Sequence, residues 1–203
     1  MRADGLLPED LTACFALIEQ TSRSDYESSA AKWQPTAKLK EMRSPELRYI
    51  LVRDKNSHRI HGFTSLMPTY EEGQPVIYCY EIHLDSELQG YVDSVPFSFA
   101  CRVSVFPNTN QPPPRTGLGT LLMSLHSTVA ANLPPITKVM LTCFLSNQRG
   151  LDFYRRLGFA KDDISPEPRK LRYGKTFTPD YVILSKPVRS SAVVGDDLVP
   201  GSD

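Results

Sequence analysis

The sequence lacks the features that assign many proteins to a class at once. Its 23 Lys plus Arg balance 23 Asp plus Glu, so no net charge favours broad nucleic-acid binding. No apolar run approaches the ~18 residues of a membrane-spanning helix, and the first residues lack the pattern of a secretory signal. We expect neither nucleic acid nor a membrane as a direct partner.

Metal-ligand patterns are also missing. The four histidines form no HExxH pair, and the four cysteines are widely spaced, at Cys14, Cys79, Cys101 and Cys143. We therefore expect no metal cofactor. The cysteines are interpreted as small apolar residues of a protein from a reducing compartment.

Hydrophobic periodicity predicts one α/β domain over 1–186, with a mixed sheet. A helix begins at Pro8 with an apolar stripe of Leu11, Phe15 and Ile18, and the sequence turns polar after Gln20. Further helices are expected over 36–42, 117–131 and 147–157. Strands rich in β-branched and aromatic residues are expected over 47–53, 59–67, 76–84, 138–144 and 181–184. Residues 187–203 are expected to form a disordered tail.

A glycine turn before the third predicted helix indicates an anion site. Gly117-Leu118-Gly119 precedes an amphipathic helix, whose free amide hydrogens and positive dipole end suit a diphosphate. Taken alone, the same pattern fits a plain tight turn. Its context is more specific: Tyr78-Cys79-Tyr80-Glu81 lies in the strand before it, and Asn147 follows the next strand.

With the Phe153-to-Phe159 segment FYRRLGF, this arrangement resembles the GNAT acetyltransferase superfamily. The resemblance implies a mostly antiparallel mixed sheet flanked by helices, in which two splayed strands form a cleft for acetyl-CoA. It also implies that the pyrophosphate binds a loop of pattern Gln/Arg-x-x-Gly-x-Gly/Ala.

Further short matches resemble the NatD family of that superfamily. They are KVMLT at 138–142, YVILS at 181–185, and Tyr26-Glu27-Ser28-Ser29 followed by Trp33. The resemblance covers 8–186 apart from 91–115. It implies acetylation of the N-terminal α-amine of histones H-four and H-two-A, which begin Ser-Gly-Arg-Gly. We expect a monomer that acts on histone tails in the cytoplasm and nucleus.

The segment 91–115 departs from the family pattern. It holds five prolines and no glycine, and it places Pro114 where the loop needs Gln or Arg. If the segment is removed, Gln89-Gly90 joins Thr116-Gly117-Leu118-Gly119 and the pattern is complete. The segment is interpreted as an insertion in the pyrophosphate loop, either a retained intron or a genuine surface loop. Codons for Gly90-Tyr91-Val92 can contain the donor-like string GTATGT, so sequencing mature transcripts would decide between the two.

Glu81 is the candidate general base. Strand alternation puts Tyr78, Tyr80 and Ile82 on one face, and Cys79, Glu81 and His83 on the other. A carboxylate among apolar neighbours in a central strand is costly to bury without a purpose. Two alternatives stay open: Glu81 pairs with a lysine or arginine, or His83 is the base.

The resemblance also implies substrate-binding residues. Tyr26, Tyr80, Thr142 and Tyr181 would line the peptide site, with Glu71 holding a substrate arginine. The family has a second acid where this sequence has Thr69, although Glu72 is near enough in sequence to compensate. Without the resemblance, these tyrosines would be interpreted as core residues.

The implied cofactor site includes strand, loop and helix residues. Ile82, His83 and Leu84 would bind the pantetheine arm through their backbone, and Asn147 would contact acetyl-CoA near the thioester. Tyr154 stands where many GNAT enzymes keep a tyrosine that protonates the thiolate, although NatD-like chains can lack it. The pyrophosphate would bind Gln89, Gly90, Thr116, Gly117, Leu118, Gly119 and Thr120.

Two alternative functions remain at this point. The first is a GNAT acetyltransferase for lysine or another amine. The second is a catalytically impaired CoA-binding protein, because the insertion at 91–115 interrupts the loop that holds the pyrophosphate.

Overall fold

The computed structural model describes residues 1–89 and 117–188. The helices are α1 (Pro8–Ser28), α2 (Pro35–Met42), α3 (Leu118–Ala131) and α4 (Gln148–Arg156). The strands are β1 (Arg48–Arg53), β2 (Ile60–Glu71), β3 (Gln74–Leu84), β4 (Lys138–Phe144), β5 (Ala160–Lys161), β6 (Arg169–Lys170), β7 (Thr176–Phe177) and β8 (Tyr181–Pro187). Short 3₁₀ turns occupy Ala3–Gly5, Ser86–Leu88 and Arg172–Gly174.

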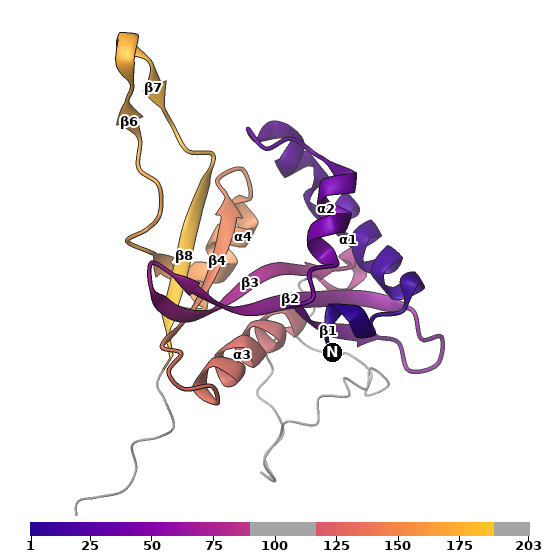
Figure 1. The fold of residues 1–203 in the computed structure, drawn as a ribbon. Coiled ribbons are helices and arrows are strands. Elements are labelled where there is room, and N and C mark those ends of the chain that lie inside the picture. Colours follow the sequence, from indigo (N-terminus) through magenta and orange to yellow (C-terminus); the bar gives the residue numbers. More distant parts are fainter. Residues whose placement is uncertain (90–116, 189–203) are drawn as a thin grey trace, which may run out of the picture.

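Six strands form one sheet in the order β1-β2-β3-β4-β8-β5. Its neighbours pair antiparallel except β3 and β4, which are parallel. The predicted fold class, a mixed and mostly antiparallel sheet flanked by helices, is confirmed. Strands β6 and β7 form a separate hairpin that extends away from the sheet (Figure 1).

Helices cover both faces of the sheet. Helices α1 and α2 lie over one face, and α3 lies across the other (Figure 1). Cys14 and Ile18 of α1 pack with Phe63 of β2 on the first face. On the second face, Met123 of α3 and Leu151 of α4 belong to the cluster that fills the space against β3, β4 and β8.

Helix α1 continues beyond the predicted end at Gln20 to Ser28. Its polar second half forms a solvated face, where Arg23 forms ion pairs with Glu19 at 3.8 Å and Glu27 at 2.7 Å. Tyr26 packs against Trp33, with ring centroids 5.4 Å apart. The extension places Thr21 in regular helix, facing the sheet residue His83.

A β-bulge at Tyr80 interrupts the side-chain alternation that was predicted for β3. Leu66 of β2 pairs with Cys79 and Ser65 pairs with Glu81, so Tyr80 is an extra residue in the register. Cys79 consequently packs with the α3 cluster, whereas Glu81 reaches α2 on the opposite face. The prediction that Cys79 and Glu81 share a face is wrong, because one inserted residue reverses the side-chain alternation.

Strands β3 and β4 part after a short parallel ladder. Their pairing runs from Val76 and Lys138 to Cys79 and Leu141, yet β3 continues to Leu84 and β4 to Phe144. The two central strands, β3 and β4, are therefore splayed, as expected of the fold.

The last strand is longer than the predicted 181–184. Strand β8 extends to Pro187, and the Val188 amide donates to the Thr137 carbonyl at 2.7 Å. The insertion 91–115 and residues 189–203 lie outside the described residues. Within the described ranges, no helix has the length and apolar character needed to cross a membrane.

Candidate active site

A cavity of about 690 Å³ opens beside the C-terminal end of β3. It is walled by α1, the start of α3 and the length of α4. The predicted cofactor residues that line it are Ile82, His83, Leu84, Gln89, Gly117, Leu118, Gly119, Thr120 and Asn147. The two others, Gly90 and Thr116, lie outside the described residues.

The N-terminus of α3 opens into this cavity. Gly117 is the N-cap, with ordinary φ of −56°, and no side chain caps the helix. The first amides of an uncapped helix lack intrahelical partners and attract anions. A Cβ on Gly119 would lie 3.3 Å from Phe153 Cζ of α4, so glycine here permits close packing of the two helices.

Two arginines of α4 line the cavity, although the sequence analysis did not predict them as site residues. Arg149 and Arg156 are exposed and both belong to the lining. They are two helical turns apart and so lie on one face of α4. This spacing could have been recognised in the sequence. They add positive charge opposite the α3 N-terminus.

Asn147 has a structural role as well as a place in the cavity wall. Its side-chain oxygen accepts a hydrogen bond from the Gly150 amide at 2.8 Å and caps α4. The side chain is thereby fixed where β4 ends and the cavity begins.

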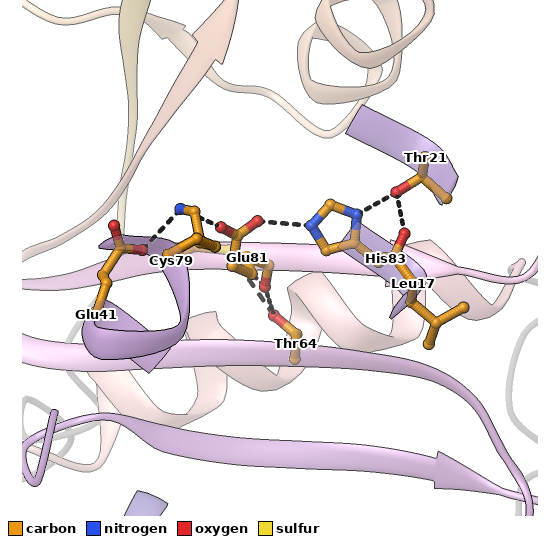
Figure 2. Close-up of polar contacts among 8 residues, drawn as sticks. Leu17, Thr21, Glu41, Thr64, Cys79, Glu81 and His83 are labelled. Carbon is orange, nitrogen blue, oxygen red and sulfur yellow. Dashed lines mark hydrogen bonds and ion pairs between the residues drawn. The ribbon is translucent and has the colours of Figure 1, made fainter. Parts of the chain in front are cut away.

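Glu81 lies in a buried network rather than on the cavity wall (Figure 2). Its carboxylate accepts from Lys38 Nζ at 2.9 Å and contacts His83 Nε2 at 2.5 Å. Although burial favours the neutral acid, His83 and then Lys38 hold the pKa of Glu81 at about 2. The alternative in which Glu81 pairs with a lysine is thus realised by Lys38.

Lys38 connects this network to α1 and α2. Burial opposes its charge, but Glu81 raises its pKa above the usual value. Its ammonium also donates to Glu41 at 2.8 Å and lies 5.0 Å from the centre of the Tyr26 ring. The helix over 36–42 was predicted, whereas its contact with Glu81 was not.

The predicted peptide-binding side chains gather on the α1 side of the sheet. Thr142 and the Tyr78 hydroxyl are 2.5 Å apart, and the Tyr78 and Tyr80 rings are separated by 5.5 Å. Tyr26 meets Phe144 edge-on at 4.9 Å, and Phe144 is the cross-strand partner of Tyr181. Cross-strand partners share a sheet face.

Tyr80 and Glu71 are accessible from the same side. Tyr80 is 39% exposed, so it is no core residue. Burial, then Glu41 and Glu71, raise the pKa of Tyr80. Glu71 ends β2 at the hairpin tip and makes no ion pair with any residue in the described ranges.

Tyr154 lies on the cavity wall opposite the end of β3. Burial, followed by the nearby Cys79, Cys143 and Glu81, raises its pKa well above the usual value. It therefore stays a neutral phenol at physiological pH. In the part of the chain described, no three His, Cys, Asp or Glu side chains gather as metal ligands would.

No known protein-family model matches the sequence. Several solved structures share the fold at low identity. Protein smu.2055 from Streptococcus mutans matches with a TM-score of 0.57 and 16% identity over 91% of this chain and 97% of that one. NAA60 from Arabidopsis thaliana, in complex with a bisubstrate analogue, matches with a TM-score of 0.55 and 11% identity over 92% and 97%.

PaiA N-acetyltransferase from Thermoplasma acidophilum, in complex with coenzyme A, matches with a TM-score of 0.55 and 13% identity over 90% of this chain and 95% of that one. A putative acetyltransferase of the GNAT family from Desulfovibrio desulfuricans matches with a TM-score of 0.54 and 15% identity over 90% and 95%. The chain therefore has the fold of the GNAT acetyltransferases.

Proposed function

We propose that the chain transfers acetyl from acetyl-CoA to an amine, and that this amine is the N-terminal α-amine of histones H-four and H-two-A. The observation that carries the proposal is the cavity at the parted strands. Every cofactor residue predicted from the sequence and described in the structure lines it. The uncapped α3 N-terminus supplies the anion site that a pyrophosphate needs.

Different residues of the chain would bind the cofactor and return a proton to its thiolate. The amides of Gly119 and Thr120 would bind the phosphates, with Arg149 and Arg156 neutralising their charge. The β3 backbone beyond Cys79 has no β4 partner, so it would bind the pantetheine amides. The carbonyls of Glu81 and Leu84 already accept from Thr64 and Gln89. Tyr154 would return a proton to the departing thiolate.

The acceptor amine must lose a proton before it attacks. An N-terminal amine, with pKa about 7.7–8.0, is neutral far more often at pH 7 than a lysine amine near 10.4. The group that we propose to accept this proton belongs to the buried network formed by Lys38, Glu81 and His83. The polar side chains of Tyr26, Tyr80, Thr142 and Tyr181 would orient the peptide, and Glu71 would pair with the arginine at its third position.

The function is tested with a free Ser-Gly-Arg-Gly peptide and its N-terminally blocked counterpart that carries a lysine. We expect acetylation of the free α-amine only, measured by mass spectrometry with acetyl-CoA as donor. Equal acetylation of the blocked peptide would favour the lysine-directed alternative. No acetylation of either would support a CoA-binding protein without activity.

Glu71→Gln is expected to raise the KM for the Ser-Gly-Arg-Gly peptide by about tenfold, since a charge-assisted hydrogen bond to guanidinium is worth about 1.5–3 kcal/mol. The effect should disappear on Ser-Gly-Ala-Gly. Glu9→Gln, at an exposed carboxylate in the first turn of α1, is the matched control. Equal losses on both peptides would rule out the proposed arginine contact.

Removal of 91–115 joins Gly90 to Thr116 and restores the complete loop pattern. We expect the shortened chain to bind acetyl-CoA about tenfold more tightly, because adjacent loop amides form a better anion nest. Isothermal titration calorimetry on both chains measures the difference. Identical affinity and turnover would mean that the segment does not disturb the site.

A further inference from the structure

A line of three hydrogen-bonded side chains leads from the buried ion pair to the cavity. Glu81 contacts His83 at 2.5 Å, and His83 contacts Thr21 at 2.5 Å (Figure 2). Building on the proposed acetyl transfer, we propose that His83 Nδ1 accepts the proton of the acceptor amine. The Thr21 hydroxyl passes this proton on from the cavity, and Glu81 acts as the positioning residue for His83.

Counting hydrogens shows which nitrogen of His83 is free. Glu81 already accepts from Lys38 Nζ through Oε1 at 2.9 Å. A carboxylate can only accept hydrogen bonds, so the His83 Nε2 that faces its Oε2 carries a hydrogen. In the neutral imidazole, Nδ1 then has no hydrogen, and it faces Thr21.

The Thr21 hydroxyl can form a hydrogen bond with either protonation state of His83 without a shift of its oxygen. Its Oγ1 lies 2.5 Å from His83 Nδ1 and 2.7 Å from the Leu17 carbonyl. When His83 is neutral, the single hydroxyl hydrogen points to Nδ1. When His83 is protonated, Nδ1 donates to Thr21 and the hydroxyl hydrogen points to Leu17.

The cavity reaches His83 and Thr21 but not the Glu81 side chain. Both residues belong to the lining, and Glu81 does not. The side chains of Glu81 and His83 are 9% and 6% exposed, so a proton from the cavity reaches either of them only through a neighbouring group, and Thr21 offers that link to His83. Both oxygens of Glu81 are already engaged. Its low pKa, about 2, also makes it a weak base toward an amine. Histidine is the side chain whose ordinary pKa lies nearest to neutral.

Two bonds to hydrogen break and two form during the proton transfer. The N–H bond of the ammonium breaks and a new O–H bond forms on Thr21, directly or through one water. The original Thr21 O–H bond breaks and its hydrogen binds His83 Nδ1. The positive charge moves from the amine to the imidazolium, which the Glu81 carboxylate stabilises. The order carboxylate, imidazole, hydroxyl is also that of hydrolase triads.

Charged groups from several elements act on this line. Lys38 and Glu41 of α2 face Glu81, and the Phe63 ring of β2 packs on His83 at 5.4 Å. Lys38 thus offsets one of the two carboxylates, and Arg149 and Arg156 of α4 line the cavity that reaches His83.

The first kinetic test uses a variant that keeps the hydrogen bond to Glu81 but removes the proton acceptor. His83→Gln can still donate to Glu81, yet it cannot take up a proton. We expect kcat to fall at least a hundredfold and the shape of its pH profile to change. Thr21→Val should lower kcat without changing the KM for acetyl-CoA, and Thr21→Ser should restore it.

NMR of ¹⁵N-histidine provides a readout that does not depend on turnover. We expect neutral His83 in the intact chain to carry its hydrogen on Nε2. In Glu81→Gln the new amide can donate to Nε2, so the hydrogen should move to Nδ1. An unchanged tautomer would mean that Glu81 does not fix the hydrogen of His83, which the relay requires.

The outcomes separate the relay from the proposed function. Full activity of His83→Gln beside an inactive Glu81→Gln would overturn the relay and make Glu81 the base. An Nδ1–H tautomer in the intact chain would overturn the relay whether or not the chain is active. Bound acetyl-CoA without acetylation of any peptide would overturn the proposed function.

Discussion

Glu81→Gln is expected to lower kcat by about a hundredfold or more, while the Kd for acetyl-CoA changes by less than about threefold. The variant removes the carboxylate that the proton-accepting group requires, and general-base catalysis is typically worth 10²–10⁴-fold. The side chain is absent from the cavity wall, so cofactor binding should survive. Stopped-assay kinetics and calorimetry measure the two effects.

Asp85→Asn is a matched control for this variant. Asp85 is also buried, 6% exposed, and also faces a cation and a histidine, Arg59 at 3.1 Å and His61 at 3.7 Å. It does not line the cavity. A similar loss of turnover in Asp85→Asn would mean that disturbing any buried carboxylate lowers activity, and Glu81 would have no special role.

The Glu81 variant should also change how stability depends on pH. Because the pKa of Glu81 is lowered from 4.5 to about 2 in the fold, the ionised group stabilises the protein above pH 4.5. That stabilisation is lost as the pH falls from 4.5 toward 2. The difference in unfolding free energy between the intact chain and Glu81→Gln should therefore shrink between pH 6 and pH 3 in urea titrations.

Gly119→Val is expected to raise the Kd for acetyl-CoA by about a hundredfold. A Cβ at this position already lies 3.3 Å from Phe153 Cζ, and the added methyl groups would occupy the space in front of the α3 amides. Valine is tolerated in helices at least as well as glycine, so α3 should persist. Circular dichroism checks the fold and calorimetry measures the affinity.

Gly5→Val is the control for this variant. A Cβ on Gly5 meets no atom within 4 Å, and Gly5 lies in the first 3₁₀ turn, away from the cavity lining. Unchanged affinity is expected there. Unchanged affinity in Gly119→Val as well would contradict the placement of the phosphates at the start of α3.

Much of the sheet could be predicted because its strands carry strong local signals. The run KVMLTCF predicted β4 with the bounds found in the structure, Lys138–Phe144. Strands β5, β6 and β7 have two residues each, which is too short for any periodicity. The polar half of α1 escaped prediction because its stability comes from ion pairs and from Tyr26 packing rather than from an apolar stripe.

The sequence predicted which residues belong to the site but not how their side chains are oriented or paired. The glycine turn was predicted from its motif and the end of β3 from the family resemblance, and both line the cavity. The bulge at Tyr80 has no local signature, yet it decides that Glu81 faces α2. The pair of Lys38 with Glu81 joins residues 43 positions apart in the chain, and only the packed helix α2 brings them together.

A crystal structure of the chain with acetyl-CoA tests the central claim most directly. We expect the pyrophosphate within hydrogen-bonding distance of the amides between Gly117 and Thr120. The thioester should lie where β3 and β4 part, beyond Cys79 and Leu141. A cofactor bound on another surface, or a cavity that stays empty at saturating acetyl-CoA, would contradict the account.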